Sequence, residues 1–476
     1  MKVKMSQYLL ESKPLLRKMV NRLAEDFEYV SVLGTDTAGK TFTVRRTGEE
    51  ISDTFWNERG YVFRLYNGAF YSEFSINNIN EDNLEEKLEE IKSSVQNQFK
   101  AVKASGIHLN EYPVMEEEQI SQFYYGSIED NYEGLSYKDK LERMESLKDN
   151  MLKKSELLID AMVSYKEVHV SKIFLSNKKD LEQSYIWSEG YLVAIAKRDK
   201  TVKYAVRGYS GLKSIQLLAD MEKDIEEVVQ EAIELLDSKP VVPGEYDVIC
   251  SPEVAGLIAH EAFGHGVEMD MFVKNRAKAA EYLGKPVASP LVRMHDGAAA
   301  AKHVSTYLFD DEGSMASDTV IIDNGILKTG INDLMSAMKL NIPATGNGKR
   351  ESFERKAYSR MTNTFFGPGK DKLEDMISSI EYGFLLKGME SGMEDPKNWG
   401  IQCIITKGLE IKNGKLTGKV VSPVIMTGYV PDVLQSITMV SDDFELFGNG
   451  ACGKGHKERA KTSDGGPYMK LKARLG

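Results

Sequence analysis

The sequence has few cysteines, and their arrangement excludes a disulfide-stabilised fold. Cys250, Cys403 and Cys452 are odd in number and far apart, whereas small secreted proteins carry even-numbered cysteines at short spacings. Cys250 and Cys403 lie in the apolar stretches VICS and IQCIIT, where a cysteine usually acts as a small buried hydrophobic residue. Cys452 differs, because glycines flank it in GNGACGKG and allow another part of the chain to approach its thiol closely.

Long apolar segments are also missing. No window approaches the roughly 18 apolar residues that a membrane-spanning helix requires. The first residues, MKVKMSQYLLESKPLL, place a glutamate where a signal peptide needs an unbroken apolar stretch. The sequence therefore predicts no association with a membrane, and we expect the protein in the cytoplasm.

Positively charged residues are also fewer than negatively charged ones. The net charge of the 476 residues is -11, which argues against binding a phosphate backbone across the whole surface. We therefore expect no nucleic-acid partner. Basic residues are concentrated after Cys452, in KGHKERAKTSDGGPYMKLKARLG. We interpret this tail as a solvated terminus, which is the usual state of a run of charges.

The pattern of the chain changes near residue 240. Residues 1–240 alternate amphipathic helices with strands and include a hairpin signal at Asn67-Gly68. Two prolines and a glycine in SKPVVPGEY then mark a boundary. Residues 241–476 are richer in glycine and in alternating strands joined by Asn-Gly turns, which is typical of antiparallel sheet. We predict an α+β fold with an N-terminal α/β domain (1–240) and a β-rich C-terminal domain (241–476).

One motif in the first part suggests nucleotide binding. Gly34–Thr41, GTDTAGKT, matches the phosphate-loop pattern G-x-x-x-x-G-K-[ST]. Such a loop needs a following helix, whose N-terminal amides hold the phosphates. The next residues, FTVRR, alternate as a strand instead. We therefore interpret Gly39-Lys40 as a hairpin turn and keep an NTP-binding protein that uses Gly34–Thr41 as an alternative.

A second motif, HEAFGH, suggests a metal site. The preceding SPEVAGLIA predicts a buried helix with a cap and a proline at its start. On a regular α-helix, five residues at about 100° each place His260 and His265 some 140° apart, so they would not converge. A π-bulge would restore their alignment, and Gly264 tolerates such a distortion. The spacing permits a metal site, but it equally permits two capping or core histidines.

A catalytic zinc ion needs three protein ligands and one open position. Glu268 lies about one turn after His265, and Cys452 lies among glycines. Either residue is a candidate third ligand beside the two histidines.

These residues resemble one family. HEAFGHGVEMD is similar to the H-E-A-x-G-H-x-x-E-x-D signature of the TldD/PmbA family of zinc metallopeptidases. The similarity extends over residues 245–455 in the family's order. It is looser in the N-terminal part, where YVFRLYNGAFYSEF carries it. The blocks beside the signature are SPEVAGLIAHE, DDEG, ATGNGKRESF, SRMTNTFF, SIEYG, ITMVSDDFEL and GACGKG.

The resemblance implies a site and an activity. It makes His260, His265 and Cys452 the zinc ligands and Glu261 the general acid/base. It implies a peptidase that hydrolyses extended or unfolded peptides inside a cavity enclosed by a homodimer, or by a heterodimer with a related family member. A non-catalytic zinc-binding subunit of a peptidase complex is the alternative within the family.

Two segments depart from the family pattern. Residues 389–400, MESGMEDPKNWG, replace a glycine-rich and less acidic stretch, and the tail lacks the usual apolar finish. We expect these departures to affect substrate preference and pairing rather than the chemistry. The sequence does not identify residues that stabilise an oxyanion; Arg350, Arg360 and Asn363 are candidates, with ordinary surface or turn roles as the alternative.

Overall fold

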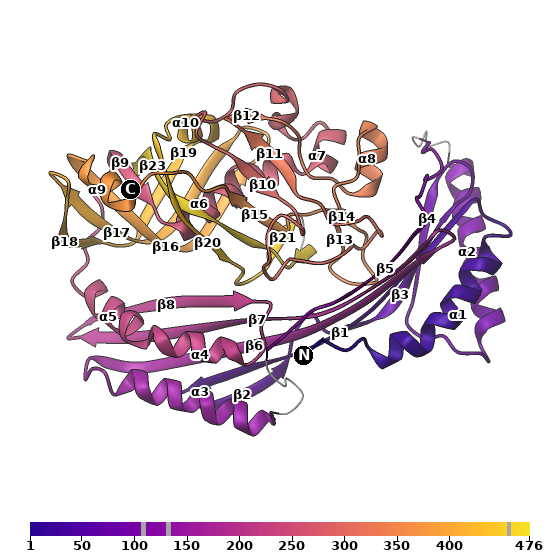
Figure 1. Cartoon of the computed structure of the whole chain (residues 1–476), viewed down its shortest axis with the longest axis horizontal. Coiled ribbons are helices and arrows are strands. Elements are labelled where there is room, and N and C mark those ends of the chain that lie inside the picture. The colour runs from indigo at the N-terminus through magenta and orange to yellow at the C-terminus, as the bar shows by residue number, and fades with distance from the viewer. Residues whose placement is uncertain (106–110, 130–134, 455–457) are drawn as a thin grey trace.

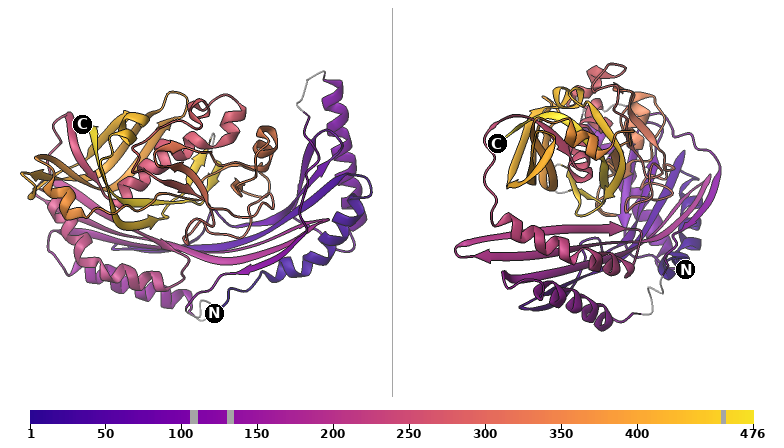
Figure 2. Two further views of the ribbon diagram at one scale, coloured as in Figure 1. Left: turned by 45° about the horizontal axis from the view of Figure 1, so that its top comes forward. Right: turned by 60° about the vertical axis from the view of Figure 1, so that its left-hand side comes forward.

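The computed structural model describes residues 1–105, 111–129, 135–454 and 458–476. An eight-stranded sheet has the order β4-β3-β1-β6-β7-β5, with β2 beside β1 and β8 beside β7. An eleven-stranded sheet forms the core of a second body, which lies above the long curved first sheet in Figures 1 and 2. The predicted boundary near residue 240 falls in the connection between the two sheets.

The first sheet is covered on one side by helices. Helices α3, α4 and α5 pack against β1, β6, β7 and β8, whereas α1 and α2 pack against the other half, at the right-hand end of Figure 1. The strands are β1 (Tyr29–Arg45), β2 (Gly48–Asp53), β3 (Glu58–Tyr66), β4 (Tyr71–Ile76), β5 (Ile120–Tyr125), β6 (Leu158–Ser176), β7 (Lys179–Arg198) and β8 (Thr201–Gly211). The helices are α1 (Gln7–Leu23), α2 (Leu84–Ala104), α3 (Tyr137–Leu152), α4 (Gln216–Lys223) and α5 (Ile225–Leu235).

The asparagine-glycine turns predicted from the sequence are confirmed. Asn67-Gly68 lies in the connection between the paired strands β3 and β4. Asn324-Gly325 and Asn413-Gly414 close two hairpins of the second body, and all four of these residues have positive φ angles. A type I′ turn requires positive φ at both central positions, which asparagine and glycine adopt most readily.

Strand β1 contradicts both interpretations of Gly34–Thr41. The segment lies within one continuous strand of 17 residues, so Gly39-Lys40 is not a hairpin turn. Lys40 pairs with Glu167 of β6 on one side and with Asp53 of β2 on the other. A Cβ atom added to Gly39 would lie 2.6 Å from the Glu167 carbonyl oxygen, so glycine serves close strand packing. The backbone amides are used by the sheet and no helix follows, which removes the basis for a phosphate loop.

We expect Lys40→Ala to change neither nucleotide affinity nor stability appreciably. Lys40 Nζ lies 2.7 Å from Asp53 Oδ1 at the surface, and exposed ion pairs contribute little to stability. The melting temperature should stay within about 2 °C of wild type. Calorimetric titration with Mg-ATP and thermal denaturation test this. ATP binding by the wild type that disappears in the variant would reinstate the phosphate loop.

The second body is built from short strands and short helices around its eleven-stranded sheet. That sheet contains β9 (Gly244–Cys250), β10 (Met294–Asp296), β11 (Thr319–Asp323), β12 (Ile326–Leu327), β15 (Asn363–Phe366), β16 (Tyr382–Asp395), β17 (Gly400–Lys412), β18 (Lys415–Val421), β19 (Val424–Tyr429), β20 (Met439–Phe447) and β23 (Ser463–Leu475). Two separate pairs are β13 (Gly348–Lys349) with β14 (Tyr358–Ser359) and β21 (Cys452–Lys454) with β22 (Glu458–Ala460). The helices are α6 (Pro252–Ile258), α7 (Met269–Val273), α8 (Leu334–Leu340), α9 (Leu373–Ser378) and α10 (Val430–Gln435). Within the described ranges, no helix is both long and apolar enough to cross a membrane.

The basic tail is a strand of this sheet, so its interpretation as a solvated terminus was wrong. Strand β23 pairs with β9, β15, β19 and β20. Leu471, Ala473 and Leu475 are buried, while Lys472 and Arg474 between them are exposed. The apolar and basic residues alternate with the period of a strand, and this alternation carries more structural information than the charge.

Buried ion pairs join the two bodies. Arg64 of β3 lies 2.5 Å from Glu312, and Lys172 of β6 pairs with Asp311 of the same acidic run. In the opposite direction, Arg350 of the second body donates to Glu73 of β4 at 2.9 Å. Burial raises the pKa of Glu73, but Arg64 and Arg350 outweigh this effect and lower it to about 2.

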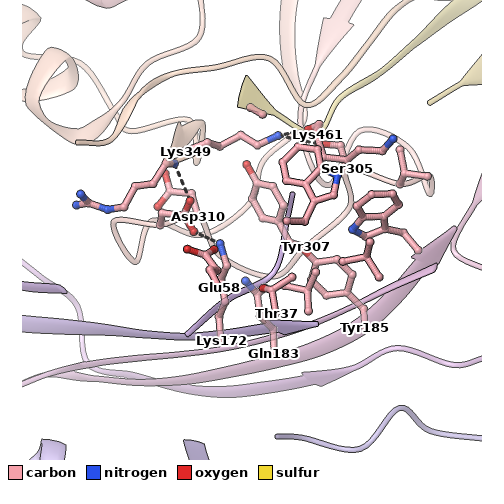
Figure 3. Close-up of a pocket in the computed structure, with 18 of the residues that line it drawn as sticks. Thr37, Glu58, Lys172, Gln183, Tyr185, Ser305, Tyr307, Asp310, Lys349 and Lys461 are labelled. Carbon is pink, nitrogen blue, oxygen red and sulfur yellow. Dashed lines mark hydrogen bonds and ion pairs between the residues drawn. The ribbon is translucent and has the colours of Figure 1, made fainter. Parts of the chain in front are cut away.

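A cavity of about 80 Å³ lies between the two bodies beside these pairs. Figure 3 shows Tyr185 and Lys172 of the first sheet facing Tyr307 and Lys349 of the second body. Lys349 donates to the hydroxyl of Ser305 at 3.0 Å. Burial lowers the pKa of Lys349 to about 7. This cavity is separate from the cluster of histidines described next.

Candidate metal centre

The helix that carries HEAFGH changes its winding at the motif. Helix α6 passes into a π-helical turn over Ala259–Gly264 and then into a 3₁₀ turn over His265–Val267. This is the distortion considered from the sequence as a way to align two histidines five residues apart. A Cβ atom added to Gly264 would lie 2.0 Å from the sulfur of Met361, so any larger residue there would displace the Met361 side chain. The wider winding brings the rings of His260 and His265 to a centroid distance of 5.2 Å.

His260, His265 and Cys452 converge at one point of the second body. Cys452 is 187 residues beyond His265 in the chain, yet its sulfur lies 3.4 Å from His265 Nε2. The ligand atoms of all three residues lie within 4.8 Å of one another. Zn–S bonds of about 2.3 Å and Zn–N bonds of about 2.0 Å separate tetrahedral sulfur and nitrogen ligands by roughly 3.5 Å. The donor types and their spacing therefore fit a zinc ion.

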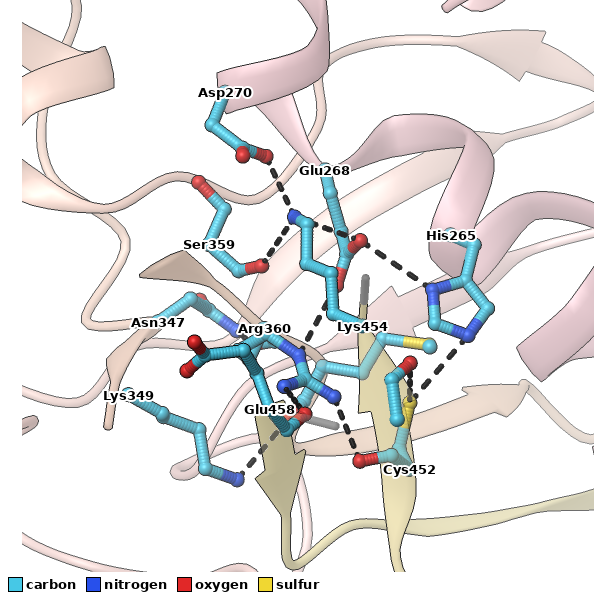
Figure 4. Close-up of polar contacts among 12 residues, drawn as sticks. His265, Glu268, Asp270, Asn347, Lys349, Ser359, Arg360, Cys452, Lys454 and Glu458 are labelled. Carbon is cyan, nitrogen blue, oxygen red and sulfur yellow. Dashed lines mark hydrogen bonds and ion pairs between the residues drawn. The ribbon is translucent and has the colours of Figure 1, made fainter. Parts of the chain in front are cut away.

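A carboxylate lies behind each histidine. His265 Nδ1 is 3.3 Å from Glu268 Oε2, and His260 Nδ1 is 3.4 Å from Asp464 Oδ2. Histidine ligands commonly turn their second nitrogen toward a carboxylate, which fixes the ring and raises its basicity. Glu268 is only 2% exposed and also lies 3.0 Å from Lys454 Nζ (Figure 4). Glu268 therefore lies behind the His265 ring rather than beside the thiol, and Cys452 is the better candidate for the third donor.

The three donors shift one another's protonation. Burial raises the pKa of the Cys452 thiol, but His260 and His265 outweigh it and hold this pKa well below its usual range. Burial lowers the pKa of His265, but Cys452 and Glu268 more than compensate and raise it to about 10. The geometry thus favours a thiolate at Cys452, which is the form of cysteine that binds a metal.

The candidate oxyanion residues have structural contacts instead. Arg360 is buried and donates to the carbonyl oxygens of Cys452, at 2.8 Å, and Glu458, at 2.6 Å, which fixes the β21–β22 hairpin (Figure 4). Arg350 pairs with Glu73. The Asn363 amide donates to two backbone carbonyls of the second body, each at 3.1 Å. None of the three candidates lines the cleft beside the histidines, which favours the ordinary structural roles that were their alternative.

An open cleft of about 500 Å³ adjoins the cluster, and Glu261 lies in its wall. Burial raises the pKa of Glu261, while His260 and His265 act against this shift. Residues 389–394 of strand β16 also line this cleft. A Cβ atom added to Gly392 would lie 2.5 Å from Glu261 Cγ, so the strand reaches Glu261 only because glycine occurs there.

Comparison with known proteins supports the resemblance seen in the sequence. Residues 243–474 match the PmbA/TldA metallopeptidase C-terminal domain. A metalloprotease of Methanocaldococcus jannaschii is 30% identical over 461 residues, which are 94% of this chain and 96% of the relative. The chain belongs to the TldD/PmbA family. A zinc metalloprotease TldD homolog of Saccharolobus solfataricus is 30% identical over 258 residues, which are 54% of this chain and 55% of the relative.

Solved structures of similar fold agree with this assignment. The crystal structure of TldE from Thermococcus kodakarensis superposes with a TM-score of 0.74 at 17% identity and covers 97% of this chain and 100% of its own. A Thermotoga maritima structure gives a TM-score of 0.76 at 21% identity, covering 98% and 100%. The α+β fold predicted from the sequence is therefore that of the TldD/PmbA family.

Two residues of the candidate site escaped the sequence reasoning. The position of Asp464 depends on the packing of α6 against β23. A Cβ atom on Gly256 of α6 would lie 2.5 Å from the backbone nitrogen of Gly465, so the helix packs directly on this strand. This contact places Asp464 beside His260. Its sequence signal was the acid immediately before Gly465-Gly466-Pro467.

Glu394 is the second such residue. Both of its carboxylate oxygens are buried and have no hydrogen-bond partner among the described residues. Burial raises the pKa of Glu394 to about 9, and Glu261 and Glu268 act in the same direction against His265. Its signal was the acidic departure from the TldD/PmbA pattern in MESGMED.

Proposed function

We propose that the protein is a zinc-dependent peptidase with His260, His265 and Cys452 as metal ligands. The observation that carries the proposal is the convergence of these three donors beside a cleft that also contains Glu261. Two histidines and one cysteine leave a tetrahedral ion an open position, as in catalytic zinc sites. The relatives named metalloproteases support the same class of reaction.

Glu261 is proposed as the general acid/base. Bound zinc would supply Lewis acidity, which polarises a peptide carbonyl and makes water more acidic. The Glu261 carboxylate accepts the proton of the attacking water and then donates it to the departing amine nitrogen. Burial favours the protonated form of the Glu261 carboxyl and so helps it to hold that proton between the two transfers. Glu268 and Asp464 keep the two imidazole rings in place throughout.

We infer that the substrate is an extended or unfolded peptide. Strand β9 pairs with β16 over Gly383–Leu386, whereas β17 pairs with β16 on its other side as far as Asp395. Beyond Leu386, where β16 passes the cleft, no strand among the described residues pairs with the edge of β16 that β9 occupies earlier. An extended peptide can add to such an edge through main-chain hydrogen bonds, and that mode of binding selects for an exposed backbone.

We also propose cytoplasmic action as a homodimer or as a heterodimer with a related family member. Cys250, Cys403 and Cys452 are all free thiols, which suits a reducing compartment. The edge strand β8 exposes Val202, Tyr204 and Val206 on one face, which is a surface that a second subunit can cover.

Unfolded substrates should be cleaved much faster than folded ones. Few backbone groups of a folded domain are unpaired, so such a domain cannot add a strand to β16. The test compares a stable domain with the same domain destabilised by one core mutation, each incubated with zinc-loaded protein. The destabilised form should be degraded preferentially, and a ligand that refolds it should protect it. Equal cleavage rates of the two forms would contradict this mode of recognition.

A further inference from the structure

We propose that the cleft selects peptides with a basic side chain near the scissile bond and that Glu394 is the residue that recognises it. This inference rests on the proposed peptidase function, because the cleft is the one in which Glu261 lies. It adds a substrate class, namely peptides with lysine or arginine beside the cleaved bond.

The charges of the cleft are the first observation. Four carboxylates contribute to its described lining, and this lining contains neither lysine nor arginine. Two of the four have other partners or roles, because Asp464 lies beside His260 and Glu261 is the proposed general acid/base. Glu390 is exposed to solvent. Among these four carboxylates, Glu394 is therefore the one in the wall of the cleft that is available to bind a ligand.

The missing partners of Glu394 are the second observation. Its two oxygens are shielded from solvent and accept no hydrogen bond from the described chain. A Cβ atom added to Gly266 would lie 2.8 Å from Glu394 Oε1, so the carboxylate rests against the turn that follows His265. Buried carboxylates are usually paired, because an isolated one is costly. An ammonium or guanidinium group of a substrate would supply donors, and arginine would supply two in parallel.

The position of Glu394 on its strand indicates which substrate residue carries the cation. Gly392 contacts Glu261, and Glu394 lies two residues further along the same face of β16. Two residues of a strand advance roughly 7 Å, which is also two residues of an extended substrate. The basic side chain therefore belongs to a residue within about two positions of the scissile bond.

The experiment uses unstructured fluorogenic peptides that differ only at the positions flanking the cleaved bond, with arginine, glutamine or glutamate there. For the zinc-loaded protein, kcat/KM should be at least about 10-fold higher for the arginine peptide than for the glutamine peptide, and lowest for the glutamate peptide. Glu394→Gln should reduce the ratio of arginine to glutamine cleavage toward one. Glu394→Lys should favour the glutamate peptide, whereas the exposed control Glu381→Gln should retain the wild-type ratio.

Binding without turnover provides a second measurement. Calorimetry on the zinc-loaded Glu261→Gln variant should show tighter binding of the arginine peptide, and adding Glu394→Gln should remove the difference. Equal cleavage of the arginine and glutamine peptides by the wild type would overturn the preference and leave the peptidase function intact, whereas absence of all cleavage would overturn the function itself. Loss of zinc from Glu394→Gln would show that Glu394 supports the metal, which also overturns this assignment.

Discussion

Glu261→Gln should lower peptide turnover by about 100-fold or more while zinc remains bound, because removing a general base typically costs that much. Glutamine keeps the shape of the side chain but cannot take up a proton. Glu261 is not among the three converging donors, so the metal has no reason to leave. The measurement pairs cleavage of an unstructured peptide with zinc analysis of the same sample.

A matched control separates this effect from a general loss of fold. Glu281 lies exposed at the surface of the same body, and Glu281→Gln should retain wild-type turnover and zinc. Wild-type turnover in Glu261→Gln would assign the proton transfers to another group. If the wild type cleaves no peptide at all yet holds zinc, the protein is better described as a non-catalytic zinc-binding subunit.

Cys452→Ala should weaken zinc binding by roughly 100-fold or more, since even the loss of a residue that merely supports a ligand costs 10- to 100-fold. It removes one of three protein donors, and Glu268 cannot replace it because this carboxylate is turned toward Lys454. Zinc content after dialysis gives the result directly. Cobalt substitution adds a spectroscopic measurement, because a thiolate–cobalt charge-transfer band should be present in the wild type and absent in the variant.

Cys250→Ala is the appropriate control. Cys250 is fully buried in β9, and burial raises the pKa of its thiol to about 12, so it is a packing residue. This variant should lose some stability through the small cavity that it creates, yet keep full zinc and the charge-transfer band. Full zinc occupancy in Cys452→Ala would contradict the assigned ligand set.

The sequence predicted local features of the site better than long-range ones. The five-residue spacing and Gly264 together identified a π-helical turn as the distortion that would align the two histidines, because both concern bonds within a few residues. The hairpins at Asn-Gly pairs were predictable for the same reason. Asp464 and Glu394 were not, since their positions depend on which strands of the second sheet pass beside the metal helix, and no local pattern determines that order.

The errors have a physical origin as well. The phosphate-loop pattern at Gly39-Lys40 suggested a turn, whereas strand pairing on both sides makes β1 continuous through that point. The prediction of a solvated tail relied on the number of lysines and arginines. It did not use the alternation of these residues with Leu471, Ala473 and Leu475. A strand inside a sheet can expose basic side chains on one face of the sheet and bury apolar side chains on the other.

The ion pairs between the two bodies also determine how the molecule loses its structure. Arg64 and Glu312 are both almost fully buried, and separating such a pair typically costs about 3–5 kcal/mol. Neither sheet can therefore unfold while the other stays intact without leaving a charged group of these pairs without its partner. Heat or denaturant should consequently melt the chain in one cooperative transition, with partial openings confined to elements remote from the shared face, such as the far end of α2.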